Sequence, residues 1–182
     1  ILDASNKYTP GLKAVYYNAN NGFTWQNTVL LAPLCITDDA DTVQRKMEAT
    51  AIYLDIWLMR HVVNYIRVGY STTSYTMYNL CKDIRRQPLP ALILMLKTKL
   101  DQDDVTFEGN TAKGRNGITD LYLNQFTHRY IFHLLARLTA YIEVQSGSFA
   151  PFDQYVNRTV KNPYDIEHIW ADDYAPYSKE FA

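Results

Sequence analysis

Apolar residues recur every three or four positions through most of the chain, which is the repeat of a helix with one buried side. The longest such stretch, residues 41–68, carries one apolar row beginning at Val43 and a second, on the opposite side, beginning at Ile52. A helix that is apolar on two sides must be covered on both. We therefore predict that this helix lies at the centre of the fold.

Residues that begin and end helices set the expected boundaries. Asp38 or Asp41 is placed to accept a backbone N–H in the first turn of the long helix, and Gly69 to end it in the left-handed conformation. The same repeat predicts further helices over residues 73–86 (ended by Pro88), 91–100 (opened by Pro90) and 119–145 (closed by Gly147), with shorter helical pieces at 10–18 and 152–160.

Residues 103–118 are rich in Gly and Asn, which is typical of a loop. Sustained alternation of apolar and polar residues, the signature of hairpins and sandwiches, is absent from the sequence. The expected fold is thus mainly α, an irregular multi-helix bundle with two long helices. We assign residues 1–160 to this helical domain, with the loop at about 103–118.

Composition limits the functional classes. The 182 residues are 47% hydrophobic and 20% charged, as in an ordinary globular domain. Lys and Arg number 18 against 19 Asp and Glu, so any contact with nucleic acid requires a local basic patch.

Cys35 and Cys81 are too far apart in sequence, and too far from any His, to indicate a disulfide framework or zinc site, and we expect buried, reduced thiols. With no apolar run of about 20 residues, we expect no membrane contact and a cytoplasmic location.

One basic patch stands at the end of a predicted helix and consists of Lys82, Arg85 and Arg86. A solvated helix end that complements the helix dipole explains these cations, and phosphate binding is the functional alternative. The chain also has 15 tyrosines, which could stack on bases. Many, including Tyr53 and Tyr141, fall on predicted core faces, and packing is the favoured account. For His61, His128 and His133 we likewise expect a packing role.

A short segment near the end of the chain gathers two carboxylates and a histidine. Asp165, Glu167 and His168 lie between apolar positions. A carboxylate can hold a divalent cation that neutralises a phosphate in hydrolysis, while a neutral imidazole takes the proton from the attacking water. The alternative is a surface or capping triad without chemistry.

The segment NPYDIEHIWADDYAPYSKEF, together with TVLLAPL, YLDIWLMR, CKDIR and LLARLTAYIE, resembles the GmrSD-type modification-dependent restriction endonucleases of bacterial defence. The resemblance covers the chain from about Thr24 onward. Proteins of this family join a ParB/sulfiredoxin-like nucleotide-hydrolysing domain, a helical region and a C-terminal HNH-type nuclease domain.

This resemblance implies a role for each residue of the segment. His168 would be the general base of a ββα-metal site, with Asp165 or Glu167 at or near a Mg²⁺ or Mn²⁺ ion. Residues 161–182 would be the truncated start of the HNH motif, with its first strand, and DNA and the nucleotide-hydrolysing domain would be the partners. We expect the chain by itself to be an inactive helical connector that holds no metal tightly. The alternative is a non-catalytic helical module for interaction or DNA binding.

Overall fold

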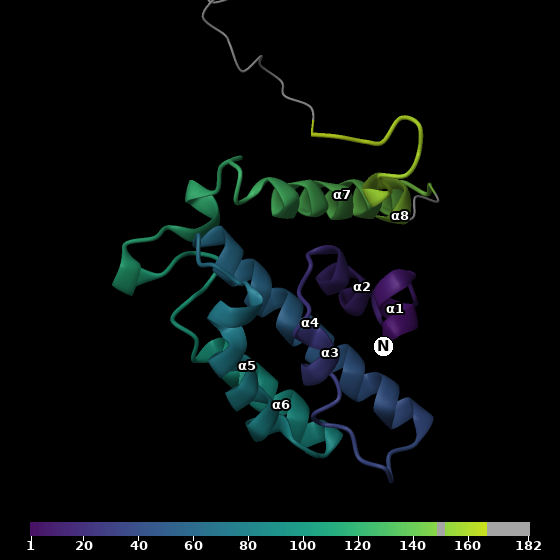
Figure 1. Cartoon of the computed structure of the whole chain (residues 1–182), viewed down its shortest axis with the longest axis vertical. Helices are drawn as coiled ribbons and strands as arrows, with labels where there is room; N and C mark the ends of the chain where they lie inside the picture. The colour runs from purple at the N-terminus through teal and green to yellow at the C-terminus, as the bar shows by residue number, and fades with distance from the viewer. Residues whose placement is uncertain (149–151, 167–182) are drawn as a thin grey trace, which may run out of the picture. The chain divides into compact units, whose positions relative to one another are not determined.

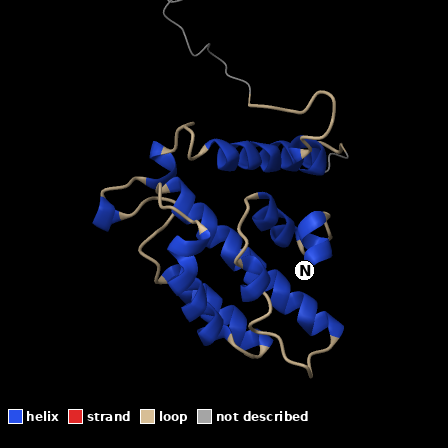
Figure 2. Ribbon diagram, in the orientation of Figure 1, coloured by secondary structure: helices blue, strands red, loops and turns tan. Residues whose placement is uncertain are grey.

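The computed structural model describes residues 1–148 and 152–166, which consist of helices and loops (Figures 1 and 2). Within these ranges the only β contact is an isolated bridge between Asn110 and Arg115. The chain divides into two compact units, residues 1–133 and residues 134–182. The first contains α1 (Leu2–Asn6), α2 (Lys13–Asn20), α3 (Gln26–Val29), α4 (Ala40–Val63), α5 (Tyr70–Ile84) and α6 (Leu89–Asp101). The mainly helical fold expected from the sequence is confirmed.

Helix α4 is the central element of the first unit, as its two apolar sides predicted. It packs against both α2 and α6 (Figure 1). Its buried side chains join those of α5 and α6 in the main core, which includes Leu54, Trp57, Leu58, Val62, Met77, Leu80, Ile84, Leu92 and Leu96. A smaller cluster, in which Val15 and Leu30 are fully buried, joins α1 and α2 to α4. Ile52, on the second apolar row, stays 42% exposed.

The predicted ends of α4 were wrong. Asp39, and neither Asp38 nor Asp41, caps the helix, because its Oδ1 accepts the backbone N–H of Thr42 at 2.8 Å. The helix ends at Val63, five residues before the expected end. There Asn64 donates from Nδ2 to the carbonyls of Arg60 (2.8 Å) and Thr106 (2.7 Å), which ties the chain to the distant loop. Gly69 instead precedes α5, with a φ of −67°.

Helices α5 and α6 occupy the predicted stretches, although α5 begins three residues and ends two residues earlier than expected, and Pro90 stands in the first turn of α6. The connection that follows contains two short 3₁₀ turns, η1 (Thr111–Lys113) and η2 (Gly117–Asp120). Most of this connection is the predicted loop.

Helix α7 (His128–Gln145) begins nine residues later than predicted. The backbone N–H groups of Phe126 and Thr127 bind the Asn124 side-chain oxygen at 2.8 and 3.0 Å. Thr127 in turn donates its hydroxyl to the carbonyl of Tyr122. Such bonds compete with the helical pattern, so the apolar repeat that continues through this stretch does not make it helical. The predicted end is confirmed, since Gly147 follows with a φ of +81°.

The second unit begins inside α7 and includes α8 (Phe152–Val156). Phe152 and Tyr155 of α8 are buried, and the Tyr155 hydroxyl donates to the Glu143 carboxylate of α7. The expectation of a packing tyrosine was wrong for Tyr141, which is exposed, and right for Tyr53 in the main core.

Candidate functional site

A groove of about 710 Å³ lies between α3 with its following turn and the C-terminal half of α5. The wall formed by α5 and the turn after it brings together the three predicted cations, Lys82, Arg85 and Arg86. Tyr78, one turn before Lys82, stands on the same wall. The opposite wall consists of Asn27, Thr28, Leu31, Ala32 and Leu34, and Cys81 completes the lining.

The three cations of the groove are exposed, and no carboxylate in the described part of the chain forms an ion pair with them. Asp83 is the only acidic residue of α5, and its Oδ2 lies 2.6 Å from the Lys99 ammonium on α6. The acidic charge nearest to the cations in sequence is therefore already neutralised. This leaves the groove with a local excess of positive charge.

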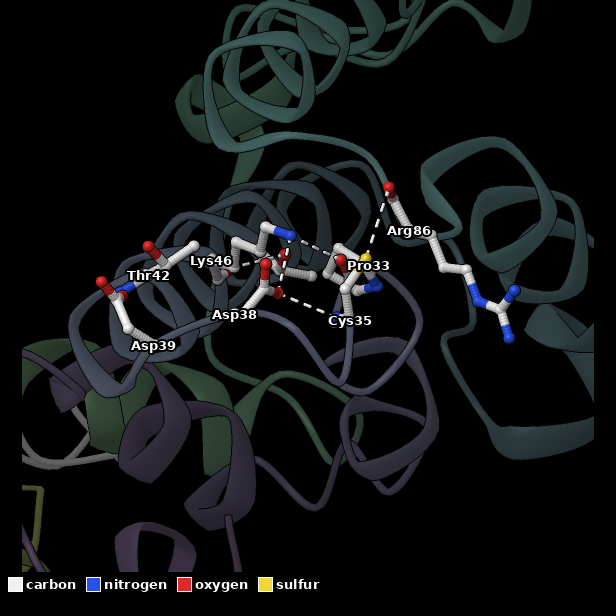
Figure 3. A network of polar contacts seen from close by, with 8 residues as sticks. Pro33, Cys35, Asp38, Asp39, Thr42, Lys46 and Arg86 are labelled. Atoms are coloured by element: carbon white, nitrogen blue, oxygen red, sulfur yellow. Dashed lines mark hydrogen bonds and ion pairs between the residues drawn. The ribbon is translucent and has the colours of Figure 1, made fainter.

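The Arg86 backbone connects the two walls of the groove. Its φ of +55° is unusual for a residue with a side chain. The conformation is held from both sides, because its N–H donates to the Ala32 carbonyl at 3.0 Å and its own carbonyl accepts from the Cys35 thiol at 3.7 Å. The Arg86 guanidinium then points away from the turn (Figure 3).

A buried ion pair holds the turn that binds Arg86 (Figure 3). The side chain of Lys46, on α4, is almost fully buried, and its Nζ donates to the Pro33 carbonyl at 3.0 Å and to the Asp38 carboxylate at 2.7 Å. The same carboxylate oxygen accepts the N–H of Cys35 at 2.8 Å. The hydrogen bond from Lys46 is the main reason that the pKa of the Asp38 carboxyl lies below its ordinary value. The groove is thereby anchored to the central helix.

Sequence reasoning found the cations but missed the rest of the groove. Tyr78 could have been found, because a residue four positions before Lys82 lies on the same face of a helix. Asn27, Thr28 and Leu31 carry no comparable signal, since only the folded chain brings α3 beside α5. The cysteines are free, as expected, but half-buried instead of buried.

The second predicted site lies mostly outside the described residues. Glu167 and His168 belong to the part that is not described, and residues 163–166 before them have no regular secondary structure. Asp165 is described, and its Oδ1 lies 3.6 Å from Nη2 of Arg158 and accepts the N–H of Ile166 at 2.9 Å. An arginine at this distance competes with a cation for the carboxylate.

A metal centre finds no support in the residues that the structure describes. They contain no group of three His, Cys, Asp or Glu side chains that could hold an ion. His133 is buried and its Nδ1 lies 2.8 Å from Oδ1 of Asn21, which is the packing role predicted for it. His128 is exposed, so the packing role predicted for it was wrong.

No protein-family model, no curated protein and no solved structure matches the chain. None of the described helices combines the length and apolar character needed to cross a bilayer.

Proposed function

We propose that this chain is a helical module that binds DNA through the groove between α3 and α5. One observation carries the proposal: Lys82, Arg85 and Arg86 line a single groove, exposed and without ion-pair partners among the described residues. Phosphates are the ligands that such converging cations bind, and displacement of counterions from DNA drives the association. Arginine adds paired N–H donors that match phosphate oxygens.

The neighbouring interactions support a binding role over a merely solvated helix end. Lys99 neutralises Asp83, and Lys46 neutralises Asp38 beside the turn that holds Arg86. Both pairs leave the groove cations available to an external anion. A net charge of −1 for the whole chain makes this local excess the feature that an anionic partner would meet.

A binding assay tests this proposal. Fluorescence anisotropy with labelled DNA is measured for the 182-residue chain, for Lys82→Ala with Arg85→Ala, and for the matched control Lys97→Ala. Lys97 is an exposed lysine of α6 outside the groove. We expect the double variant to bind at least about tenfold more weakly at low salt, through the loss of two phosphate contacts, and the control to be unchanged.

Circular dichroism verifies that the variants keep the helical fold. Equal DNA affinity of the double variant and the wild type, or no DNA binding by the wild type, would show that the groove is not a DNA site.

We further propose, on the Asp165-x-Glu167-His168 sequence and its family resemblance, that the module works in a metal-dependent DNA endonuclease of bacterial defence. In this proposal the nuclease is cytoplasmic, its HNH motif begins with a strand at this segment, and a nucleotide-hydrolysing domain is its partner. When bound, a Mg²⁺ or Mn²⁺ ion would supply charge neutralisation at the phosphate.

DNA cleavage tests the nuclease proposal separately from DNA binding. The product of the complete gene is incubated with DNA and Mg²⁺ or Mn²⁺, beside its His168→Ala variant. We expect cleavage that the substitution abolishes while DNA affinity is retained. Binding without cleavage in both proteins would leave the groove proposal in place and remove the nuclease.

A further inference from the structure

Helix α5 presents a continuous stripe of aromatic and basic side chains. Tyr75, Tyr78 and Lys82 follow one another at intervals of three and four residues, which places them on one face of the helix, and Arg85, the residue that caps its C-terminal end, comes three residues after Lys82. Tyr78, Lys82 and Arg85 line the groove, and Tyr75 extends the stripe by one turn beyond it. The stripe, defined by these four residues, runs about 15 Å along the helix axis.

The two tyrosines of the stripe are largely exposed. Tyr75 is 77% exposed and Tyr78 is 65% exposed. Within the described part of the chain, neither forms a hydrogen bond or ring contact. Tyr70, at the start of the same helix, differs: its ring stacks on Trp25 with centroids 4.6 Å apart. Two largely exposed aromatic rings without ring or hydrogen-bond partners among the described residues, beside unpaired cations, indicate a ligand with flat apolar faces and negative charge.

We propose that the groove is selective for single-stranded DNA, whose bases stack on Tyr78 and Tyr75 while Lys82, Arg85 and Arg86 bind the phosphates. This inference rests on the DNA-binding function proposed above. A duplex hides the faces of its bases within the helix, whereas a single strand exposes them to aromatic side chains. Stacking adds affinity that does not depend on sequence, since every base has a π face.

The number of cations also favours a single strand. A protein that makes about six to ten phosphate contacts on a duplex draws a large part of its affinity from charge, whereas this groove offers three cations. The opposite wall supplies the remaining contacts: Asn27 and Thr28 carry hydrogen-bonding groups, and Leu31, 58% exposed, offers an apolar surface. A wall of this mixed kind suits a splayed base better than a row of phosphates.

The test compares an oligothymidylate strand with a duplex of equal length, using the full 182-residue chain. The variants are Tyr78→Ala, Tyr78→Phe and the control Tyr141→Ala, which removes an exposed helical tyrosine of the second unit. We expect Tyr78→Ala to weaken single-strand binding at least about fivefold, the lower end of what one base–aromatic stack contributes. Tyr78→Phe should stay within about twofold of the wild type because the ring is kept, and the control should not change.

A spectroscopic signal separates stacking from a structural effect. In a strand that contains 2-aminopurine, wild type and Tyr78→Phe should alter the fluorescence of the base analogue, and saturating Tyr78→Ala should alter it less. Equal or tighter binding of the duplex, or an unchanged signal with Tyr78→Ala, would overturn the single-strand selectivity while the DNA-binding function stands. Absence of salt-dependent binding to both DNAs would overturn both proposals.

Discussion

The roles of single residues depend on contacts that distant segments make. Sequence reasoning placed a cap at Asp38 or Asp41, because both positions precede the apolar repeat. In the fold Asp39 is the cap, whereas the Asp38 carboxylate forms an ion pair with Lys46, eight residues further along the chain. Lys46 lies on a buried face of α4, and its hydrogen-bond partners, Pro33 and Asp38, lie outside that helix. The spacing of residues within the helix therefore could not reveal them. Short-range patterns therefore predicted which residue types cap the helix but not which carboxylate does so.

His61 offers a test at this scale. Its Nδ1 hydrogen donates to the Trp57 carbonyl at 2.9 Å, and burial lowers its pKa below the ordinary value of 6.5. The unfolded chain therefore takes up a proton near pH 6.5, whereas the folded chain takes it up only at a lower pH. Because protonation favours the unfolded state, stability that is present at pH 7 is lost as the pH falls. The free energy of unfolding, followed in urea, should decrease as the pH falls below about 6.5, with a slope from this group of at most about 1.4 kcal/mol per pH unit.

Two variants separate the contribution of His61 from that of other groups that titrate in the same pH range. His61→Gln should have a shallower decrease over this pH range, whereas His128→Gln, which changes an exposed residue, should match the wild type. An identical pH dependence of His61→Gln and wild type would contradict the proposed burial effect.

At the scale of elements, the helices were predictable and some of their ends were not. Helices α4, α5 and α6 follow the apolar repeat because their buried faces bind one core. The first part of the predicted 119–145 helix failed because Asn124 and Thr127 bind the backbone locally. At the end of α4, Asn64 likewise donates its side-chain amide to the Arg60 carbonyl, which would accept the Asn64 backbone N–H in a continuing helix. Where a polar side chain competes for backbone groups, hydrophobic periodicity does not reveal it.

The loop before α7 can be tested with two glycines of nearly equal conformation. Gly114 and Gly117 have φ values of +58° and +59°. A Cβ at Gly117 would lie 2.0 Å from the Phe107 carbonyl oxygen, which accepts the Ile118 N–H, whereas a Cβ at Gly114 meets nothing within 4 Å. Gly114→Ala should cost about 1 kcal/mol of unfolding free energy through its φ alone, and Gly117→Ala about 2 kcal/mol more. Equal losses in urea denaturation would refute the close approach.

The pairing of α5 with α6 predicts an effect on DNA binding from outside the groove. Lys99 neutralises Asp83, so Lys99→Ala would return a free carboxylate to the helix that carries Lys82 and ends just before Arg85. We expect this variant to bind DNA about twofold to fivefold more weakly at low salt, and Asp83→Asn to bind at least as tightly as the wild type. The double variant should resemble Asp83→Asn, because the carboxylate is then absent. A loss of affinity in Asp83→Asn equal to that in Lys99→Ala would show that the pair acts through structure and not charge.

At the scale of the whole molecule, the groove shows what a sequence can and cannot provide. Lys82, Arg85 and Arg86 are adjacent along one helix end, so their patch was visible in the sequence. The opposite wall comes from residues some fifty positions earlier, and the turn between them is fixed by a third element, α4. Because the groove forms only when α3, α4 and α5 pack together, no local sequence pattern could define it. The predicted metal segment is different, since only Asp165 of its three residues is described.

The charge distribution of the molecule leads to a final prediction. With a net charge of −1, the chain as a whole does not attract DNA, and at about 0.1 M salt charges beyond roughly 10 Å are screened. Only the three groove cations should then release counterions from a single strand, at about 0.7 per phosphate contact. A plot of log affinity against log salt concentration should therefore have a slope near −2. Arg86→Ala should make the slope shallower by about 0.7, and Lys97→Ala should leave it unchanged. A slope of the size seen with six or more phosphate contacts would mean that cations outside the groove also bind the DNA.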